Sequence, residues 1–236
     1  MITLSKRMER VASMVTEGSR VADIGTDHGY VPISLVERGK VSKAIAMDVR
    51  KGPLSKAMEH IKESGLEEKI QTRLSDGMEQ LKEGEVDSVI IAGMGGELIV
   101  KILRNASHIL PSIKELILQP QSEIYKVREE LHRLGFCIEK ESMLLDEGKY
   151  YTVIKAIKGQ EHYENQWEYL YGKKLLLEKN EILHQWLLKE YRVNEALCKK
   201  LEGVSSEAGM ARKEELLHKR SMLKGGLACY DNERIG

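Results

Sequence analysis

A short apolar run that ends in a glycine-rich turn constrains the fold of this chain more than any other feature. The run is Val21-Ala22-Asp23-Ile24, and Gly25-Thr26-Asp27-His28-Gly29 follows it directly, with Tyr30 at the start of a predicted helix. α/β folds use this succession of buried strand, tight glycine turn and helix to hold a nucleotide-like ligand at the carboxyl end of the first strand. We therefore expect a doubly wound parallel sheet with a ligand site at that strand end.

The acidic residue inside this turn, Asp27, indicates which ligand the site binds. In a dinucleotide-binding loop the corresponding position is usually a glycine, because a pyrophosphate must approach the backbone closely. A carboxylate would repel a pyrophosphate, whereas it would attract the cationic amino group and sulfonium of S-adenosylmethionine (SAM). The loop therefore favours SAM over NAD or ATP.

Strand and helix patterns alternate over residues 1–158. Five β-α units followed by two strands and a turn predict a Rossmann-like α/β domain, whose seven-stranded sheet has an antiparallel hairpin at one edge. Such an edge hairpin is typical of class I methyltransferases and not of dehydrogenases. A first helix is expected after an N-cap at Ser5. The predicted strands are 21–25, 44–48, 70–74, 86–92, 115–119, 136–140 and 151–157, with a turn at Gly148 before the last.

The pattern changes in residues 159–236, where strand signals vanish. Leucines recur at helical spacing between residues 170 and 201 and again between 210 and 227, and residues 203–209 interrupt them. We predict a separate C-terminal domain, an α-helical coiled-coil hairpin whose first helix would span roughly 60 Å at 1.5 Å per residue.

Overall composition excludes few partners. The chain carries 37 basic and 37 acidic residues, so bulk charge gives no argument for nucleic acid, although a local basic face remains compatible with it. Cys137, Cys198 and Cys229 are far apart, which argues against a disulfide scaffold or a zinc site. No long apolar run marks a signal peptide or membrane span, so we expect a cytoplasmic protein without a metal.

The residues expected to bind SAM gather at the ends of the first four predicted strands. Asp48 has the spacing of an acid that accepts hydrogen bonds from ribose hydroxyls, and Asp76 could accept one from the adenine amino group. Each alone has a structural explanation, since Asp48 could cap a helix and Asp76 could merely shape a turn. Their joint spacing favours a cofactor site. The full set is Asp23, Gly25, Asp27, His28, Gly29, Asp48, Val49, Asp76, Gly77, Ala92, Gly93 and Met94.

Five segments of this chain form a combination that is more specific than a general SAM-binding pattern. They are Leu4-Ser5-Lys6-Arg7-Met8, Ala22 to Tyr30, Asp76-Gly77, Ala92-Gly93-Met94-Gly95-Gly96 and Leu118-Gln119-Pro120-Gln121. Together they resemble one known family, the bacterial tRNA adenine-N1 methyltransferases that modify position 22. The resemblance covers the full length, because that family also appends a C-terminal coiled-coil domain to a Rossmann-like domain. It implies the fold, SAM as the cofactor and tRNA as the substrate.

One absence agrees with methylation of a ring nitrogen. Enzymes that methylate exocyclic amino groups usually carry an Asn/Asp-Pro-Pro-aromatic motif after the fourth strand, where this chain has Gly93-Met94-Gly95-Gly96. Ring N1 is already nucleophilic, because its lone pair lies in the plane of the ring. The enzyme must instead unpair the adenine, exclude water and align N1 with the methyl group. We expect neither a metal nor a covalent intermediate.

For the substrate side, we assign His28, Tyr30 and Gln119 to the adenine pocket as candidate catalytic residues, and Arg7 and Arg10 to RNA phosphates. The hairpin would clamp the body of a tRNA, and the protein would act as a monomer. Two alternatives stay open. One is a class I methyltransferase for a small molecule or protein, with the hairpin as a dimerisation arm; the other is a non-enzymatic SAM-binding scaffold or RNA chaperone.

Overall fold

The computed structural model describes residues 2–204 and 206–231, and the chain forms two compact units, Met1–Glu161 and His162–Gly236. The first unit ends at Glu161, three residues after the predicted domain boundary at residue 158. The end of the predicted C-terminal domain, residues 232–236, lies outside the described residues.

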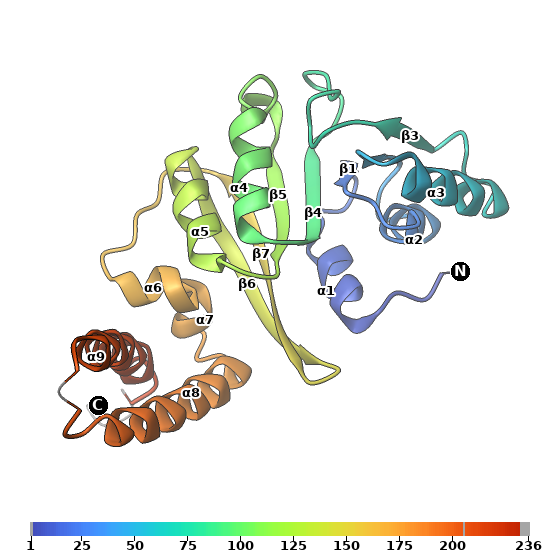
Figure 1. The fold of residues 1–236 in the computed structure, drawn as a ribbon. Coiled ribbons are helices and arrows are strands. Elements are labelled where there is room, and N and C mark those ends of the chain that lie inside the picture. The colour runs from blue at the N-terminus through green and yellow to red at the C-terminus, as the bar shows by residue number, and fades with distance from the viewer. Residues whose placement is uncertain (1, 205, 232–236) are drawn as a thin grey trace. The chain divides into compact units, whose positions relative to one another are not determined.

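The first unit contains a seven-stranded sheet in the order β3-β2-β1-β4-β5-β7-β6 (Figure 1). Strands β1 to β5 run parallel, and β7 is antiparallel to both of its neighbours, β5 and β6. This confirms the predicted Rossmann-like sheet with an antiparallel edge hairpin. The strands are β1 Arg20–Ile24, β2 Lys43–Asp48, β3 Ile70–Leu74, β4 Ser88–Met94, β5 Glu115–Pro120, β6 Phe136–Asp146 and β7 Lys149–Lys158.

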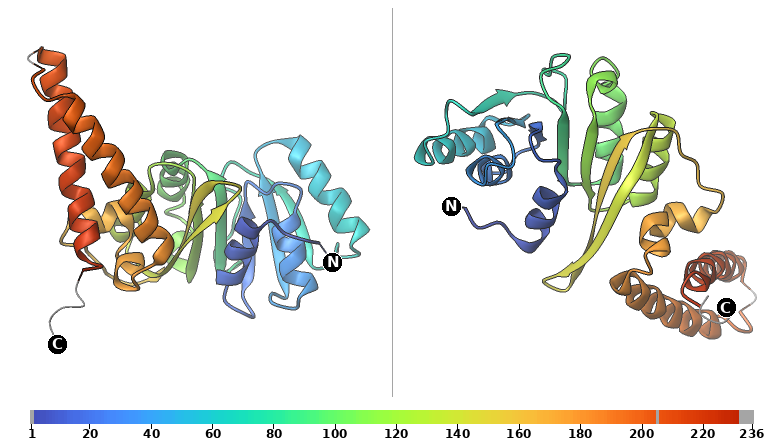
Figure 2. Two further views of the ribbon diagram at one scale, coloured as in Figure 1. Left: turned by 90° about the horizontal axis from the view of Figure 1, so that it is seen from below. Right: turned by 180° about the vertical axis from the view of Figure 1, so that it is seen from behind.

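Helices cover both faces of this sheet (Figures 1 and 2). From β1, helices α2 and α3 connect strands that are added toward the β3 edge of the sheet. From β4, helices α4 and α5 connect strands that are added toward the opposite edge. Because such crossovers are right-handed, the two helix pairs lie on opposite faces. The helices are α1 Lys6–Met14, α2 Tyr30–Glu37, α3 Lys51–Glu63, α4 Gly96–Asn105, the 3-10 helix η1 Leu110–Ser112 and α5 Ile124–Arg133.

The reversal of strand order between β1 and β4 leaves a crevice at the carboxyl ends of these strands, the usual ligand position in open α/β sheets. The central strands are apolar on both faces, as buried parallel strands are. Four residues of these strands are completely buried: Val21, Ile90, Ile91 and Ile117. This packing fixes the strand ends that carry the predicted site.

The antiparallel strands β6 and β7 are longer than the sequence predicts. They extend to Asp146 and back from Lys149, which pair across a two-residue turn. Glu147 and Gly148 both have positive φ, +47° and +76°, as a type I′ hairpin turn requires. The predicted strands were too short because residues 141–146 and 149–150 lack a regular alternation of apolar and polar residues.

The second unit is helical, but the single long helix predicted before residue 201 is wrong. Gly172, with φ of +93°, ends one helix, and Lys179, with φ of +49°, ends another. The side chain of Asn180 then caps a new helix by accepting a hydrogen bond from Leu183 N at 3.0 Å. The helices are α6 Gln166–Tyr171, α7 Lys173–Leu177, α8 Glu181–Lys200 and α9 Glu207–Ala228.

Helices α8 and α9 form an antiparallel hairpin. The buried Asn194 donates a hydrogen bond to Leu216 O at 3.1 Å, and Glu190 forms an ion pair with Lys219 at 2.7 Å. An earlier residue of α8 is thus paired with a later residue of α9, as in two antiparallel helices. At 20 residues, α8 is about 30 Å long, half the predicted length. Among residues 2–204 and 206–231, no helix combines the length and apolar character needed to cross a membrane.

Candidate active site

A cavity of about 490 Å³ opens at the carboxyl edge of the first unit's sheet, around the ends of β1, β2, β3 and β4. Most of the predicted cofactor residues line it: Gly25, Asp27, Asp48, Val49, Asp76, Gly77, Ala92, Gly93 and Met94. The cavity wall also contains residues that sequence reasoning missed: Met8, Ile24, Arg50, Ser75, Leu98, Ile102 and Gln121. Of these, Leu98 and Ile102 are one helical turn apart on α4, a spacing that could have indicated a common face.

The turn after β1 is held across the neighbouring strand. The amides of Gly25 and Thr26 both donate to Met47 O at 2.8 Å. Gly25 has φ of +73°, and a Cβ atom there would lie 2.1 Å from Cε of Met94. A side chain at this position would therefore strain the backbone and displace the flexible end of Met94 in the cavity wall, and the positive φ favours glycine.

Carboxylates give the cavity a negative character. Asp48 is buried at the end of β2, and its Oδ1 accepts from Arg50 N at 2.7 Å, which fixes its orientation. Asp27 is exposed on the loop, and Asp76 follows β3 in a turn that the hydroxyl of Ser75 closes by donating to Gly77 O at 3.0 Å. Such an arrangement suits a ligand with cationic and hydroxyl groups.

Asp23 was predicted to bind the cofactor, and the structure places it behind the β1 turn with only 6% of its surface exposed. Burial raises the pKa of Asp23 to about 6; a hydrogen bond with Thr26 opposes this rise, and the nearby carboxylates of Asp48 and Asp27 add to it. Asp23 therefore lies behind the cavity wall and does not line the cavity.

Gln119, a predicted catalytic residue, is fully buried in β5, one layer behind the cavity. Its Oε1 accepts from Arg7 Nη1 at 2.6 Å and from Gly93 N at 3.1 Å. Arg7 itself lines the cavity, and its guanidinium carbon lies 5.2 Å from the centre of the Tyr151 ring. Gln119 therefore positions two parts of the cavity wall instead of presenting its amide to the cavity.

The other two predicted catalytic residues belong to an aromatic group beside Asp27. His28 stacks on Tyr30 with ring centroids 5.3 Å apart, and His60 of α3 stacks on both, 5.5 Å from His28 and 5.0 Å from Tyr30. His28 Nε2 lies 3.3 Å from Asp27 Oδ1. Nothing in the sequence pattern singles out His60, because its position depends on how α3 packs.

The remaining predicted residues lie outside the cavity wall. Gly29 is the N-cap of α2, and a Cβ atom there would lie 3.2 Å from the Cβ atom of Ala57. Arg10 is exposed on α1. No group of three or more histidine, cysteine, aspartate or glutamate side chains that could hold a metal ion occurs in the described parts of the chain.

Comparison with known proteins agrees with this geometry. A family model described as a methyltransferase domain matches residues 4–154. The tRNA (adenine(22)-N(1))-methyltransferase of Bacillus subtilis is 33% identical over 229 residues, which are 94% of this chain and 96% of the relative.

Two solved structures agree over nearly the whole chain. Streptococcus pneumoniae Sp1610 in complex with S-adenosyl-L-methionine has a TM-score of 0.83 at 36% identity and covers 95% of this chain and 100% of its own. Mycoplasma capricolum TrmK, in complex with the cofactor product S-adenosyl-homocysteine, has a TM-score of 0.84 at 28% identity. The match covers 97% of this chain and 99% of that structure.

Together, the sheet order, the acidic cavity at the strand ends and these matches define a SAM-dependent class I methyltransferase. Within that class the extent of the likeness to the B. subtilis enzyme is specific. The chain belongs to the tRNA (adenine(22)-N(1))-methyltransferase family. The predicted fold, cofactor and family are thereby confirmed.

Proposed function

We propose that this protein transfers the methyl group of SAM to N1 of the adenine at position 22 of a tRNA. The observation that supports this most is the acidic cavity at the ends of β1 to β4 in a chain related to the B. subtilis enzyme over nearly its full length. The same relationship favours tRNA over the small-molecule or protein substrates left open by the sequence.

The cavity residues fit SAM chemically. Asp48, fixed at the end of β2, would accept hydrogen bonds from the ribose hydroxyls, and Asp76 would accept one from the adenine amino group. Asp27 and the buried Asp23 supply negative charge for the amino group and sulfonium. Gly25 and Gly93 leave room for close approach of the ligand to the backbone.

Arg7 serves this cavity in our proposal, and this replaces the predicted contact with RNA phosphate. Its guanidinium is held by the buried Gln119 and lies against the Tyr151 ring, so it is pre-oriented on the cavity wall. An oriented guanidinium suits the carboxylate of the methionine part of SAM, because it can donate two parallel hydrogen bonds. The exposed Arg10 remains a candidate for RNA phosphate.

The main contribution of the protein to methyl transfer is to position the adenine. When bound, SAM supplies a methyl group made electrophilic by the sulfonium. N1 of adenine carries a lone pair and no proton, so no general base is required. The exposed ring of Tyr30 stacks on the half-buried ring of His28 beside Asp27, and an unpaired adenine could stack on this pair. Aligning N1 with the methyl group and excluding water then provide the rate enhancement.

The helical second unit supports binding of the tRNA body in this proposal. The hairpin of α8 and α9 carries exposed lysines and arginines that can contact phosphates without reading sequence. We propose that the protein works as a monomer in the cytoplasm, where its substrate occurs.

Nucleoside mass spectrometry tests this function. Unmodified bulk tRNA is incubated with the protein and isotope-labelled SAM, and labelled 1-methyladenosine is the expected product. Asp48→Ala should abolish the label at subsaturating SAM, because the ribose contacts are lost. SAM binding without any labelled nucleoside would retain the cofactor site and exclude tRNA as the substrate.

A further inference from the structure

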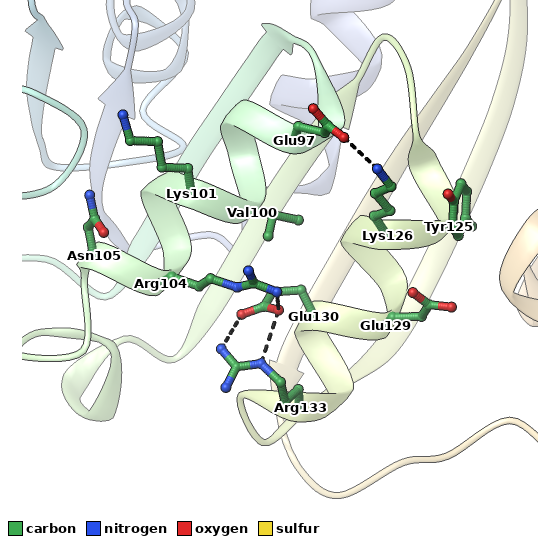
Figure 3. A pocket seen from close by; sticks show the side chains of 10 residues that line it. All are labelled: Glu97, Val100, Lys101, Arg104, Asn105, Tyr125, Lys126, Glu129, Glu130 and Arg133. Atoms are coloured by element: carbon green, nitrogen blue, oxygen red, sulfur yellow. Dashed lines mark hydrogen bonds and ion pairs between the residues drawn. The ribbon is translucent and has the colours of Figure 1, made fainter.

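A second and larger cavity, about 700 Å³, lies between α4 and α5 (Figure 3). One face of each helix lines it, and Val100, 8% exposed, is its apolar member. Four of its side chains are basic and three are acidic, all labelled in Figure 3: Lys101, Arg104, Lys126 and Arg133 against Glu97, Glu129 and Glu130. We call this cavity the α4–α5 groove.

A buried carboxylate organises the two arginines of the α4–α5 groove. Glu130 is only 3% exposed, and its Oε2 accepts from Arg104 Nη2 at 2.8 Å and from Arg133 Nε at 3.0 Å. A further hydrogen bond joins Arg133 Nη2 to Glu130 Oε1, and Figure 3 shows both guanidinium groups meeting this carboxylate. These bonds outweigh the effect of burial and lower the pKa of Glu130, so it stays ionised.

The guanidinium groups remain available to a ligand. The side chains of Arg104 and Arg133 are each 58% exposed. Each guanidinium carries five N–H groups, of which the bonds to Glu130 use one from Arg104 and two from Arg133. Two oriented, outward-facing guanidinium groups are the donors that recognise phosphate oxygens best.

The acids of the α4–α5 groove do not cancel this preference. Glu130 is already satisfied by two cations, and Glu97 is paired with Lys126. No ion pair joins Lys101 to another described residue. Glu129 lines the rim in an exposed position, where it opposes an anionic ligand. The net formal charge of the lining is +1. Lys101 contributes one positive charge, the group of Arg104, Arg133 and Glu130 contributes a second, and Glu129 removes one.

The α4–α5 groove lies next to the cofactor cavity, on the other side of α4. Leu98 and Ile102 of α4 line the cofactor cavity, so that one helix separates the two, a width of about 10 Å. Lys101 and Asn105 belong both to the groove and to a small hollow that contains Asp76 and Gly77. One RNA could therefore reach both places.

From these observations we infer that the α4–α5 groove binds the phosphodiester backbone of the substrate tRNA, with Arg104, Arg133 and Lys101 as the phosphate ligands. Tyr125, 36% exposed at the rim, offers a ring for an adjacent base or ribose. The inference rests on the proposed tRNA substrate and adds to it a contact surface apart from the cofactor cavity.

Binding of an unmodified tRNA transcript, measured over a range of salt concentrations, tests the inference. Lys101→Gln and Arg133→Gln should each weaken binding by about three- to tenfold and reduce the slope of log affinity against log salt by about one. Glu129→Gln should tighten binding by about twofold, since it removes a repulsive charge. Affinity for SAM alone should stay unchanged in all three.

Arg20→Gln is the matched control. Arg20 also forms an ion pair, with Asp87 at 2.9 Å, but it begins β1 and does not line the α4–α5 groove. Lys101→Gln and Glu129→Gln leave the Glu130 bonds intact, so they decide the matter even if Arg133→Gln unfolds. Wild-type affinity and salt slope in these two variants would overturn the groove assignment. A wild-type protein that neither binds nor methylates tRNA would instead overturn the proposed function, and the tRNA ligand with it.

Discussion

The buried carboxylate of Asp23 links the charge of the cofactor cavity to pH. Its pKa is raised from the ordinary value of 3.8 to about 6, mainly by burial. The folded state therefore holds this proton more tightly than the unfolded state does. The resulting contribution to stability is present below pH 3.8 and is lost as the pH rises to about 6.

Asp23→Asn should remove this pH dependence. At pH 7.5 the variant is expected to be more stable than the wild type by on the order of 1–2 kcal/mol, because it no longer buries a charge. Thermal or chemical denaturation at pH 4.5 and 7.5 measures this, and a variant that is less stable at pH 7.5 would contradict the role of burial.

The same ionisation should control affinity for SAM. A cationic ligand favours the ionised carboxylate, so wild-type affinity should increase as the pH rises through about 6. In Asp23→Asn this part of the increase should be absent. Calorimetric titrations between pH 5 and 7.5 compare the two proteins, and identical pH profiles would show that Asp23 does not act on the ligand.

Gly25 and Gly39 form a matched pair for the turn after β1. Both have positive φ, +73° and +67°, but a Cβ atom at Gly25 would press on Met94, whereas one at Gly39 has nothing within 4 Å. Both alanine substitutions should cost about 1 kcal/mol of stability through backbone strain. Only Gly25→Ala should also weaken SAM binding, by about tenfold or more. Equal SAM affinities would mean that the turn is not part of the cofactor site.

At the scale of single residues, the sequence predicts position better than orientation. Asp48, Asp76 and Gly93 could be placed at strand ends by counting along apolar runs, and each lines the cavity. The role of Gln119 could not be predicted in this way. The alternation of residues along a strand does not reveal that the Gln119 side chain is buried and accepts a hydrogen bond from Arg7.

Among the structural elements, two helical glycines should respond to alanine in opposite ways. A Cβ atom at Gly225 in α9 would lie 2.5 Å from the ring of Trp167, which is too rigid to yield at low cost. Gly225→Ala should therefore destabilise the second unit by about 2 kcal/mol or more. Gly52 in α3 has nothing within 4 Å, so Gly52→Ala should stabilise the first unit by up to about 1 kcal/mol. Thermal unfolding followed by circular dichroism measures both; a stabilising Gly225→Ala would refute the close packing of α9 on α6.

The elements themselves were predictable where a strong period met a clear stop signal. Strands β1, β2 and β4 follow from apolar runs that end in glycine or an acid, and Pro120 ends the apolar run of β5. The predicted long helix after residue 170 failed because the leucine period continues across Gly172 and Asn180. A single glycine or asparagine costs a helix little, so packing decides whether it becomes a break. Here Asn180 caps α8, and Tyr230 donates to its carbonyl oxygen at 3.0 Å.

At the scale of the whole molecule, we expect SAM binding to require only the first unit and efficient tRNA methylation to require both units. A chain ending at Glu161 keeps the complete sheet and also Glu161 itself, whose carboxylate accepts from Ile138 N at 2.8 Å. We expect it to bind SAM with affinity within about twofold of the full chain and to lose most tRNA methylation, since phosphate contacts from the hairpin are absent. Calorimetry with SAM and a methylation assay with tRNA measure the two. Full methylation by the shortened chain would show that the second unit is not needed to hold tRNA.

Methylation of adenine 22 can be tested with two transcripts of one tRNA that differ only at position 22, with adenine in one and guanine in the other. Each is incubated with the full chain and SAM and then copied by reverse transcriptase, which stops at a base methylated on N1. If the protein methylates N1 of adenine 22, a new stop should appear at position 22 in the adenine transcript and none in the guanine transcript. Equal stops in both transcripts, or a stop elsewhere, would contradict methylation of N1 at adenine 22.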